Sequence, residues 1–134
     1  MFATPLFLKA QSTAADTAQI KEACLNYVQG FYTGDSARVA KGVHADLAKR
    51  IVMKRMQYRV SNMTAAQLIS AAGGHKHPDD AGVPFNAKID IYDIDMEIAT
   101  AKIVTNKMNF FDYVQLGKIN GEWKIINVLW AYLS

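Results

Sequence analysis

Asp112 is the residue of this sequence with the clearest chemical potential. Apolar and polar side chains alternate over residues 107–118 as they do in a β-strand, and Asp112 falls on the more apolar face, between Phe110 and Val114. A carboxylate in apolar surroundings is unfavourable unless it is paired or protonated. Asp112 therefore has two interpretations: the acid of a structural ion pair with Arg50, or a carboxyl of raised pKa that contacts a ligand or transfers a proton.

His44 and Tyr27 are the candidate partners of Asp112 for acid–base chemistry. The imidazole of His44 titrates near neutral pH and suits proton transfer, but a histidine here also suits a helix end, bonded to backbone carbonyls. Tyr27 lies on the apolar side of a predicted helix, where its hydroxyl either points into a pocket or is satisfied within the core. The sequence leaves open whether either residue meets Asp112.

Two groups of basic residues suggest binding, and each also has a plainer explanation. The first group suits a phosphorylated or carboxylated ligand, or simply a solvated hairpin. It consists of Lys49, Arg50, Lys54, Arg55 and Arg59. The second, His75-Lys76-His77, offers two imidazoles without a matched third ligand, so we expect no metal and no cofactor.

The composition is typical of a single globular domain. The chain has 134 residues, 51% of them hydrophobic, and we expect an N-terminal arm over residues 1–13 and one domain over residues 14–134. A net charge of +3 is too low for a nucleic-acid-binding surface. No apolar run approaches the ~20 residues of a membrane span. Cys24 is the only cysteine, in an apolar helical position, and we expect a cytoplasmic protein without disulfides.

Helices are predicted in the first half of the chain. Thr13 with Asp16, and Thr64 with Gln67, have the spacing of capping residues at a helix start, and Gly34 suits a helix end. The predicted helices cover residues 13–32, 35–42 and 64–72.

Strands are predicted mainly in the second half. Asn120-Gly121 between alternating apolar residues is a strong hairpin signal. A further short strand is predicted from Arg50, because Ile51 and Val52 are β-branched. The long strands cover residues 86–93, 96–105, 107–118 and 122–132. Helices followed by antiparallel strands indicate the α+β class.

This order of elements, with three segments of sequence, resembles a known superfamily. The segments run from Tyr27 to Asp35, from Val43 to Arg50 and from Asp112 to Asn127. They resemble the nuclear-transport-factor-2-like superfamily and, within it, the putative lumazine-binding group, relatives of the SnoaL-like polyketide cyclases. The resemblance covers most of the chain and implies a cystatin-like cone, in which a curved antiparallel sheet encloses a pocket capped by the N-terminal helices.

For function, the resemblance implies a pocket that binds a small apolar or aromatic ligand, with no particular activity. Ketosteroid isomerases share the fold, so a cofactor-free isomerase, dehydratase or cyclase is the alternative, with Asp112 as base and His44 or Tyr27 as acid. A non-catalytic dimerisation module is a further alternative, in which bulky side chains fill the cone. Those side chains are Met53, Met56, Phe110 and Trp123.

Beyond these residues, we expect ligand contacts from Arg50, Tyr32, Phe110 and Trp123. The opposite face of the sheet must also be covered, because a large apolar patch on a monomer usually marks an interface. We therefore predict a homodimer packed sheet to sheet, with two-fold symmetry. The aromatic residues assigned to that face are Phe111, Tyr113, Trp130 and Tyr132.

Overall fold

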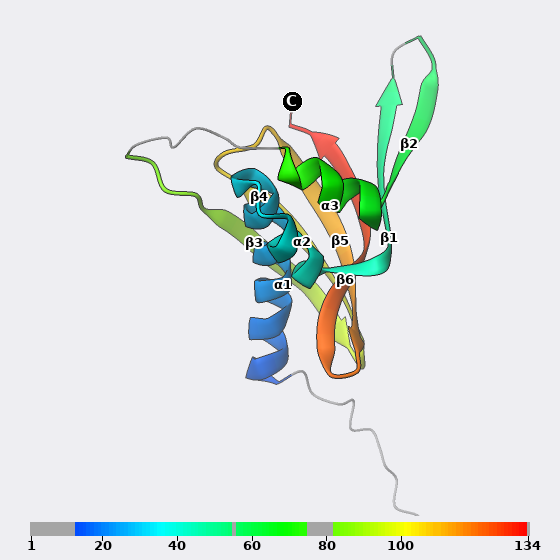
Figure 1. The fold of residues 1–134 in the computed structure, drawn as a ribbon. Helices are drawn as coiled ribbons and strands as arrows, with labels where there is room; N and C mark the ends of the chain where they lie inside the picture. Colours follow the sequence, from blue (N-terminus) through cyan, green and yellow to red (C-terminus); the bar gives the residue numbers. More distant parts are fainter. Residues whose placement is uncertain (1–12, 55, 75–81, 134) are drawn as a thin grey trace, which may run out of the picture.

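Helices pack on one face of a curved β-sheet in this computed structural model, which describes residues 13–54, 56–74 and 82–133 (Figure 1). The helices are α1 (Ala14–Thr33), α2 (Ser36–Gly42) and α3 (Ala65–Gly73). The strands are β1 (Val43–Lys54), β2 (Tyr58–Thr64), β3 (Ala87–Asp95), β4 (Ile98–Thr105), β5 (Phe110–Ile119) and β6 (Glu122–Tyr132). None of the helices within these described ranges is long and apolar enough to span a membrane. The predicted α+β class is confirmed.

Both predicted helix caps are present. The Thr13 hydroxyl accepts a hydrogen bond from the Asp16 backbone amide at 3.0 Å, and the Thr64 hydroxyl accepts one from the Gln67 amide at 3.2 Å. In both cases the second side chain bonds back to the capping residue, which completes a capping box. The helix α1 ends at Gly34, whose φ of 79° is in the left-handed region. These local signals explain why α1 and α3 were predicted to within a residue or two.

The sheet has the strand order β2-β1-β6-β5-β4-β3. Neighbouring strands are antiparallel except β1 and β6, which run parallel. The prediction of a wholly antiparallel sheet is therefore wrong for this pair. The physical reason is that no hairpin joins β1 to β6: α3 and the other four strands lie between them, and such a long connection permits a parallel pair.

The strand β1 is longer than predicted, since it begins at Val43 rather than at Arg50. Val43 and Leu47 are buried against the core, and Val43 already pairs with Ile125 of β6. At its far end, β1 forms a hairpin with β2 that projects beyond the rest of the sheet (Figure 1). Met56 lies at the tip of that hairpin and is 99% exposed, so it does not close the cone.

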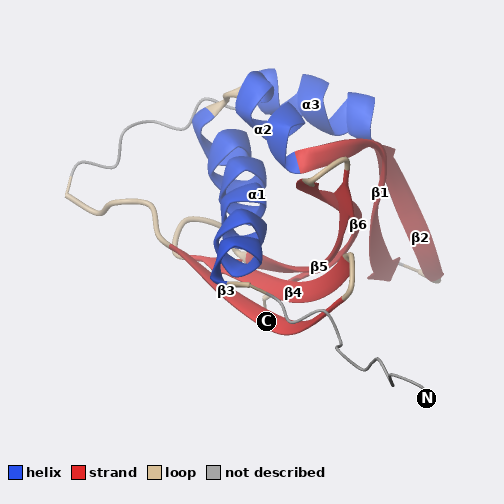
Figure 2. Cartoon of the chain, turned by 90° about the horizontal axis from the view of Figure 1, so that it is seen from below, coloured by secondary structure: helices blue, strands red, loops and turns tan. Residues whose placement is uncertain are grey.

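The sheet bends around α1, so that one face of the sheet is concave (Figure 2). Register shifts between Ile91 and Asp93 and between Gln115 and Leu116 contribute to this bend. At the lower end, β5 and β6 are joined at Asn120-Gly121, with φ angles of 52° and 81°, which confirms the predicted hairpin. We call the face toward the helices the inner face and the opposite face the outer face. The core between α1 and the inner face includes Ile20, Cys24, Leu68, Ile103, Leu116 and Ile125.

Helix α2 packs closely on α1 at a glycine. Gly42, the last residue of α2, lies so near α1 that an added Cβ atom would be 2.5 Å from the Ala23 carbonyl oxygen and 3.0 Å from the Tyr27 amide nitrogen. Both atoms belong to backbone that cannot rotate away. Gly73, the last residue of α3, has no such neighbour within 4 Å.

We therefore expect Gly42→Ala to lower the free energy of unfolding by about 1–3 kcal/mol, as overpacked core substitutions do. Gly73→Ala is the matched control, and it should leave stability unchanged or raise it by up to about 1 kcal/mol, because alanine has the higher helix propensity. Urea unfolding followed by circular dichroism measures both. Equal effects of the two substitutions would contradict the close packing of α2 on α1.

Candidate functional site

Asp112 lies on the inner face of β5, as its place in the alternation predicted. It pairs with Trp130 of β6 on one side and Ile103 of β4 on the other. Only 1% of its surface is exposed. The carboxyl is therefore surrounded by core side chains, and what neutralises it decides the chemistry of the site.

The cation near Asp112 is Lys49 of β1. Lys49 pairs with Val128 of β6, which directs its side chain to the inner face, and the residue is 7% exposed. Its Nζ donates a hydrogen bond of 2.7 Å to the hydroxyl of Tyr27. Tyr27 is fully buried on α1, so this bond joins the helix layer to the sheet. Lys49, Tyr27 and Asp112 form one buried polar cluster.

Aromatic rings enclose the ammonium group of Lys49, each with its centroid 5.2–5.7 Å from Nζ. We call this set the aromatic box; its members are Tyr27, Phe31, Phe110 and Trp130. Tyr27 and Phe31 are four residues apart on α1 and therefore share one side of the helix. Phe110 and Trp130 come from neighbouring strands, and their rings meet edge to face at 5.1 Å. Such rings stabilise a cation by about 0.5–2 kcal/mol.

The titration of the cluster is shifted by burial. Burial raises the pKa of Asp112 to about 6, while the charge of Lys49 and hydrogen bonding with Tyr27 act in the opposite direction. Burial lowers the pKa of Lys49, and the charge of Asp112 opposes that shift. Burial and the nearby Asp112 charge raise the pKa of Tyr27 well above its ordinary value. An acid, an amine and a phenol thus lie together in surroundings that disfavour charge.

One atom of the cluster is unsatisfied. The Oδ1 atom of Asp112 is buried and has no hydrogen-bond partner within the described part of the chain. Buried carboxylate oxygens usually have a partner, and leaving one without is unfavourable by about 1–3 kcal/mol or more. The site therefore offers a free acceptor, or a free donor when the carboxyl is protonated, to a group from outside.

Arg50 is not the partner of Asp112. It is exposed and pairs with Leu129, on the outer face, because successive residues of a strand point to opposite sides of the sheet. The cation that acts on Asp112 is instead Lys49, through its charge and not through a direct ion pair. In the sequence, Lys49 belongs to a group of basic residues that suit either an anionic ligand or a solvated hairpin. Leu47, Lys49 and Ile51 alternate with more exposed residues, and this period-two pattern indicates that Lys49 is buried with its two apolar neighbours. The predicted strand begins only at Arg50 and therefore misses this signal.

The structure does not bring His44 to Asp112 either. His44 is the second residue of β1, rather than a helix-end residue, and its Nδ1 accepts a hydrogen bond of 3.0 Å from the Asp46 backbone amide. The same ring nitrogen lies 3.8 Å from the Asp46 carboxylate. Of the three candidate catalytic residues, only Tyr27 and Asp112 lie in the same cluster.

The remaining predicted ligand contacts are divided between different places. Phe110 belongs to the aromatic box. Tyr32 is half-buried and stacks against Phe85 at 5.4 Å. Trp123 lies at the start of β6, away from the box, where its indole N–H donates to the Asp16 carboxylate at 2.9 Å. Trp123 therefore ties the beginning of α1 to the sheet.

Metal binding finds no support in the described residues. No group of three histidine, cysteine or acidic side chains among them is arranged to hold a metal ion. His75 and His77 of the histidine pair lie outside the described residues.

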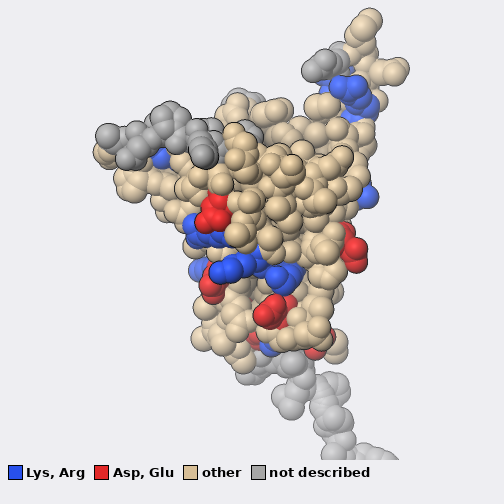
Figure 3. All heavy atoms as spheres, viewed as in Figure 1, with Lys and Arg blue, Asp and Glu red and all other residues tan. Residues whose placement is uncertain are grey.

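On the helix-side surface, basic and acidic side chains are interspersed, and basic ones also lie near the hairpin tip (Figure 3).

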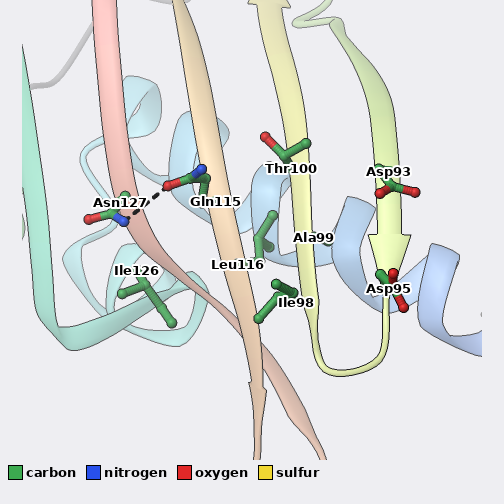
Figure 4. A pocket seen from close by; sticks show the side chains of 9 residues that line it. All are labelled: Asp93, Asp95, Ile98, Ala99, Thr100, Gln115, Leu116, Ile126 and Asn127. Atoms are coloured by element: carbon green, nitrogen blue, oxygen red, sulfur yellow. Dashed lines mark hydrogen bonds between the residues drawn. The ribbon is translucent and has the colours of Figure 1, made fainter.

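The outer face carries shallow hollows that the sequence did not indicate. One hollow, of about 390 Å³, crosses β3 to β6, and Figure 4 shows its side chains with the helices behind the sheet. A second, of about 380 Å³, adjoins it beside Arg50 and Leu129. Between them, the Asn127 amide donates to the Gln115 side chain at 3.1 Å.

The aromatic residues assigned to the outer face are in fact divided between the two faces. Phe111 and Tyr113 do lie there, with the Lys102 ammonium above both rings. Trp130 belongs to the aromatic box on the inner face, and Tyr132 packs edge to face against it at 5.1 Å. The reason is that residues an even number of positions apart in a strand share a face. Trp130 stands opposite Asp112 and so shares its inner face, and Tyr132, two positions further along β6, follows Trp130.

Comparison with known proteins gives both a family and a fold. Residues 15–131 match the family described as "putative lumazine-binding". No curated protein matches the chain. Because the solved structures below are at most 20% identical to this chain, they establish the fold alone.

Among these structures is an NTF2-like protein of unknown function from Shewanella baltica OS155, with 20% identity and a TM-score of 0.72, covering 92% of this chain and 99% of that one. Another is a ketosteroid isomerase-like protein from Erwinia carotovora atroseptica, with 13% identity, a TM-score of 0.63 and coverage of 91% and 99%. A third, from Novosphingobium aromaticivorans, is an NTF2-like protein with a cystatin-like fold, with 13% identity, a TM-score of 0.62 and coverage of 90% and 83%.

The raised pKa of Asp112 predicts a particular dependence of stability on pH. In the unfolded chain the carboxyl ionises near 3.8, and in the folded protein near 6. Between these values the folded state binds more protons, so this residue makes the protein less stable as pH rises from about 4 to 6, by up to about 3 kcal/mol. Above that window its contribution is constant.

Urea unfolding of the protein and of Asp112→Asn over this pH range isolates the effect, because other carboxyl groups cancel in the difference. The variant should gain stability relative to the parent as pH rises. Asp93→Asn, which makes the same substitution at an exposed aspartate, is the matched control. A flat difference for Asp112→Asn would contradict the raised pKa.

Proposed function

This chain belongs to the "putative lumazine-binding" family, and we propose that it binds a small, mostly apolar molecule between α1 and the inner face of the sheet. The observation that carries the proposal is the unpartnered Oδ1 of Asp112. A buried acceptor next to aromatic rings suits a flat ligand with one or two polar groups. Lumazine, a planar heterocycle with ring N–H donors and carbonyl acceptors, is a member of that chemical class.

The surroundings of Asp112 support a ligand of this shape. Phe110 and Trp130 present ring surface beside the carboxyl, and aromatic ligands stack against such rings. A ligand N–H would satisfy Oδ1, whereas its apolar part would replace water at the rings. A hydrogen bond to a charged group contributes about 1.5–3 kcal/mol, which is enough to select among ligands of similar size.

Equilibrium binding tests the proposal, with lumazine and the apolar fluorophore 1-anilinonaphthalene-8-sulfonate as probes. We expect saturable binding, and Asp112→Asn should weaken lumazine binding about 10–100-fold, the loss of one charge-assisted hydrogen bond. Asp93→Asn, which alters the outer hollow instead, should bind like the parent.

Tryptophan fluorescence locates the bound probe. The protein has two tryptophans, so quenching that persists in Trp123→Phe and disappears in Trp130→Phe places the probe at the aromatic box. Quenching that disappears in Trp123→Phe instead, or no saturable binding of either probe, would overturn the proposal.

An acid–base enzyme is the second candidate, and the raised pKa of Asp112 favours it. A carboxyl that titrates near 6 can both accept and return a proton close to neutral pH, as a general base requires. The Tyr27 hydroxyl would be the donor to a developing oxyanion, since its own pKa is raised and it remains protonated. A bound compound recovered in altered form would favour this candidate over simple binding.

We also propose that the protein forms a homodimer through its outer face. Large apolar side chains are exposed there, including Tyr92, Ile98, Tyr113 and Leu129. Charge supports a second copy as the occupant, because Arg50 lies near one edge of this face and Asp93 lines the hollow toward the other. A two-fold axis through β5 and β6 would set Arg50 of each copy toward Asp93 of the other.

Sedimentation equilibrium measures the assembly, and we expect twice the chain mass of 14.9 kDa. Tyr113→Glu introduces a charge at the centre of the outer face and should give a monomer, with the fold unchanged by circular dichroism. Tyr58→Glu makes the same substitution on the exposed hairpin and should remain dimeric. A parent protein that sediments as a monomer at micromolar concentration would refute the dimer.

A further inference from the structure

The buried amine of Lys49 has no role in the binding proposal above, and its surroundings differ from those of an ordinary lysine. It is 7% exposed, in contact range of four aromatic rings, and hydrogen-bonded to a single hydroxyl, that of Tyr27. Lysine side chains are rarely buried to this extent unless they are paired. A lysine in an apolar site is the usual arrangement for an amine that reacts with carbonyl compounds.

Two forms of the cluster compete: one in which both Lys49 and Asp112 are charged, and one with a neutral amine and a neutral carboxylic acid. The rings favour the ammonium by about 0.5–2 kcal/mol. Burial disfavours each charge by several kcal/mol. When Asp112 is protonated, its attraction for the ammonium disappears, and Lys49 loses its own proton more readily. Burial therefore increases the share of neutral amine at Lys49 relative to an exposed lysine.

We infer that Lys49 captures the carbonyl group of a small apolar or aromatic aldehyde as an imine, with Tyr27 and Asp112 assisting. This inference rests on the proposed function, because the aldehyde must enter the same interior site. Phe110 and Trp130 provide ring surface for its apolar part. The class of ligand is thereby narrowed from flat apolar molecules to those with a reactive carbonyl.

The reaction balances without an oxidant or a reductant. The Nζ lone pair forms a bond to the carbonyl carbon, and the carbonyl oxygen takes up a proton, which gives a carbinolamine. The carbon–oxygen bond then breaks, the oxygen leaves as water with a second proton, and a carbon–nitrogen double bond forms. Both protons of the amine end on the water, so the site only has to move them.

The neighbouring groups are placed for those proton transfers. The Tyr27 hydroxyl is 2.7 Å from Nζ and thus positions the nitrogen beside a donor for the carbonyl oxygen. The unpartnered Oδ1 of Asp112 is free to accept and return a proton. The Tyr27 hydroxyl, which contacts Nζ and hydrogen-bonds with Asp112, relays that proton between the nitrogen and the departing hydroxyl. Neither step requires a group from outside the described cluster.

Reductive trapping tests the inference. The full chain is incubated with substoichiometric benzaldehyde and sodium cyanoborohydride at pH 7, and the benzylated lysines are identified by peptide mass spectrometry. We expect Lys49 to be modified several-fold faster than exposed Lys54 on the same strand, because burial lowers the pKa of Lys49 and the aromatic rings hold the aldehyde beside it. Modification spread over exposed lysines, with Lys49 unreacted, would overturn the inference.

Variants separate this inference from the proposed function. Lys49→Met should lose the fast-reacting site, and Lys54→Met should retain it. Asp112→Asn should remove the part of the pH dependence of trapping at Lys49 that follows the titration of Asp112 near pH 6. If the probes of the binding experiment bind but Lys49 does not react, the imine is refuted and the binding function stands. If nothing binds and Lys49 does not react, both fail. Should Lys49→Met not fold, the modification map of the parent protein still decides.

Discussion

The interaction on which the rest of the site depends is the burial of Asp112 together with Lys49. An isolated charge in this core would be unfavourable by several kcal/mol, and removing one partner of a buried pair typically costs about 3–5 kcal/mol. The pair is 1% and 7% exposed, and Tyr27 connects it to α1 through a 2.7 Å hydrogen bond. Helix α1 is therefore joined to the sheet by a polar contact within an apolar core. Replacing a buried charged pair by a well-packed apolar cluster is often neutral or stabilising, so stability alone does not explain polar groups at this place.

The position of the pair follows from the parallel pairing of β1 with β6. Lys49 stands beside Val128 and Arg50 beside Leu129, so the two neighbouring bases point to opposite faces. A slip of one residue would turn Arg50 inward and Lys49 outward. That slip would also move Leu47 and Ile51 out of the core, which is why the apolar pattern of β1 selects the register. The identity of the buried base is thus decided by hydrophobic burial on either side of it rather than by any attraction to Asp112.

Local patterns were sufficient to predict most elements of the fold, because each depends on residues a few positions apart. The capping boxes at Thr13 and Thr64, the turn at Asn120-Gly121 and the inward face of Asp112 are all of this kind. The candidate site depended on pairings between distant segments, which alternation alone does not determine. Arg50 and His44 were proposed as partners of Asp112 because they carry suitable groups, whereas β1 places one outside the sheet and turns the other to its own backbone. Trp130 was assigned to the wrong face for the same reason, since its parity relative to Asp112 is set by the register of β5 and β6.

Strand β5 connects the two proposed sites of the molecule, the ligand site on the inner face and the dimer contact on the outer face. Phe110, Asp112 and Val114 of β5 point to the inner face, and Phe111, Tyr113 and Gln115 point to the outer face. A dimer on the outer face would hold β5 and β6 rigid from behind, and rigid strands keep the aromatic box and the carboxyl in register with Lys49. Dimerisation would then serve the inner site without contributing a residue to it. Because alternate residues have separate environments, substitutions at Tyr113 and at Asp112 act on separate faces, and any coupling between them must pass through the backbone of β5 itself.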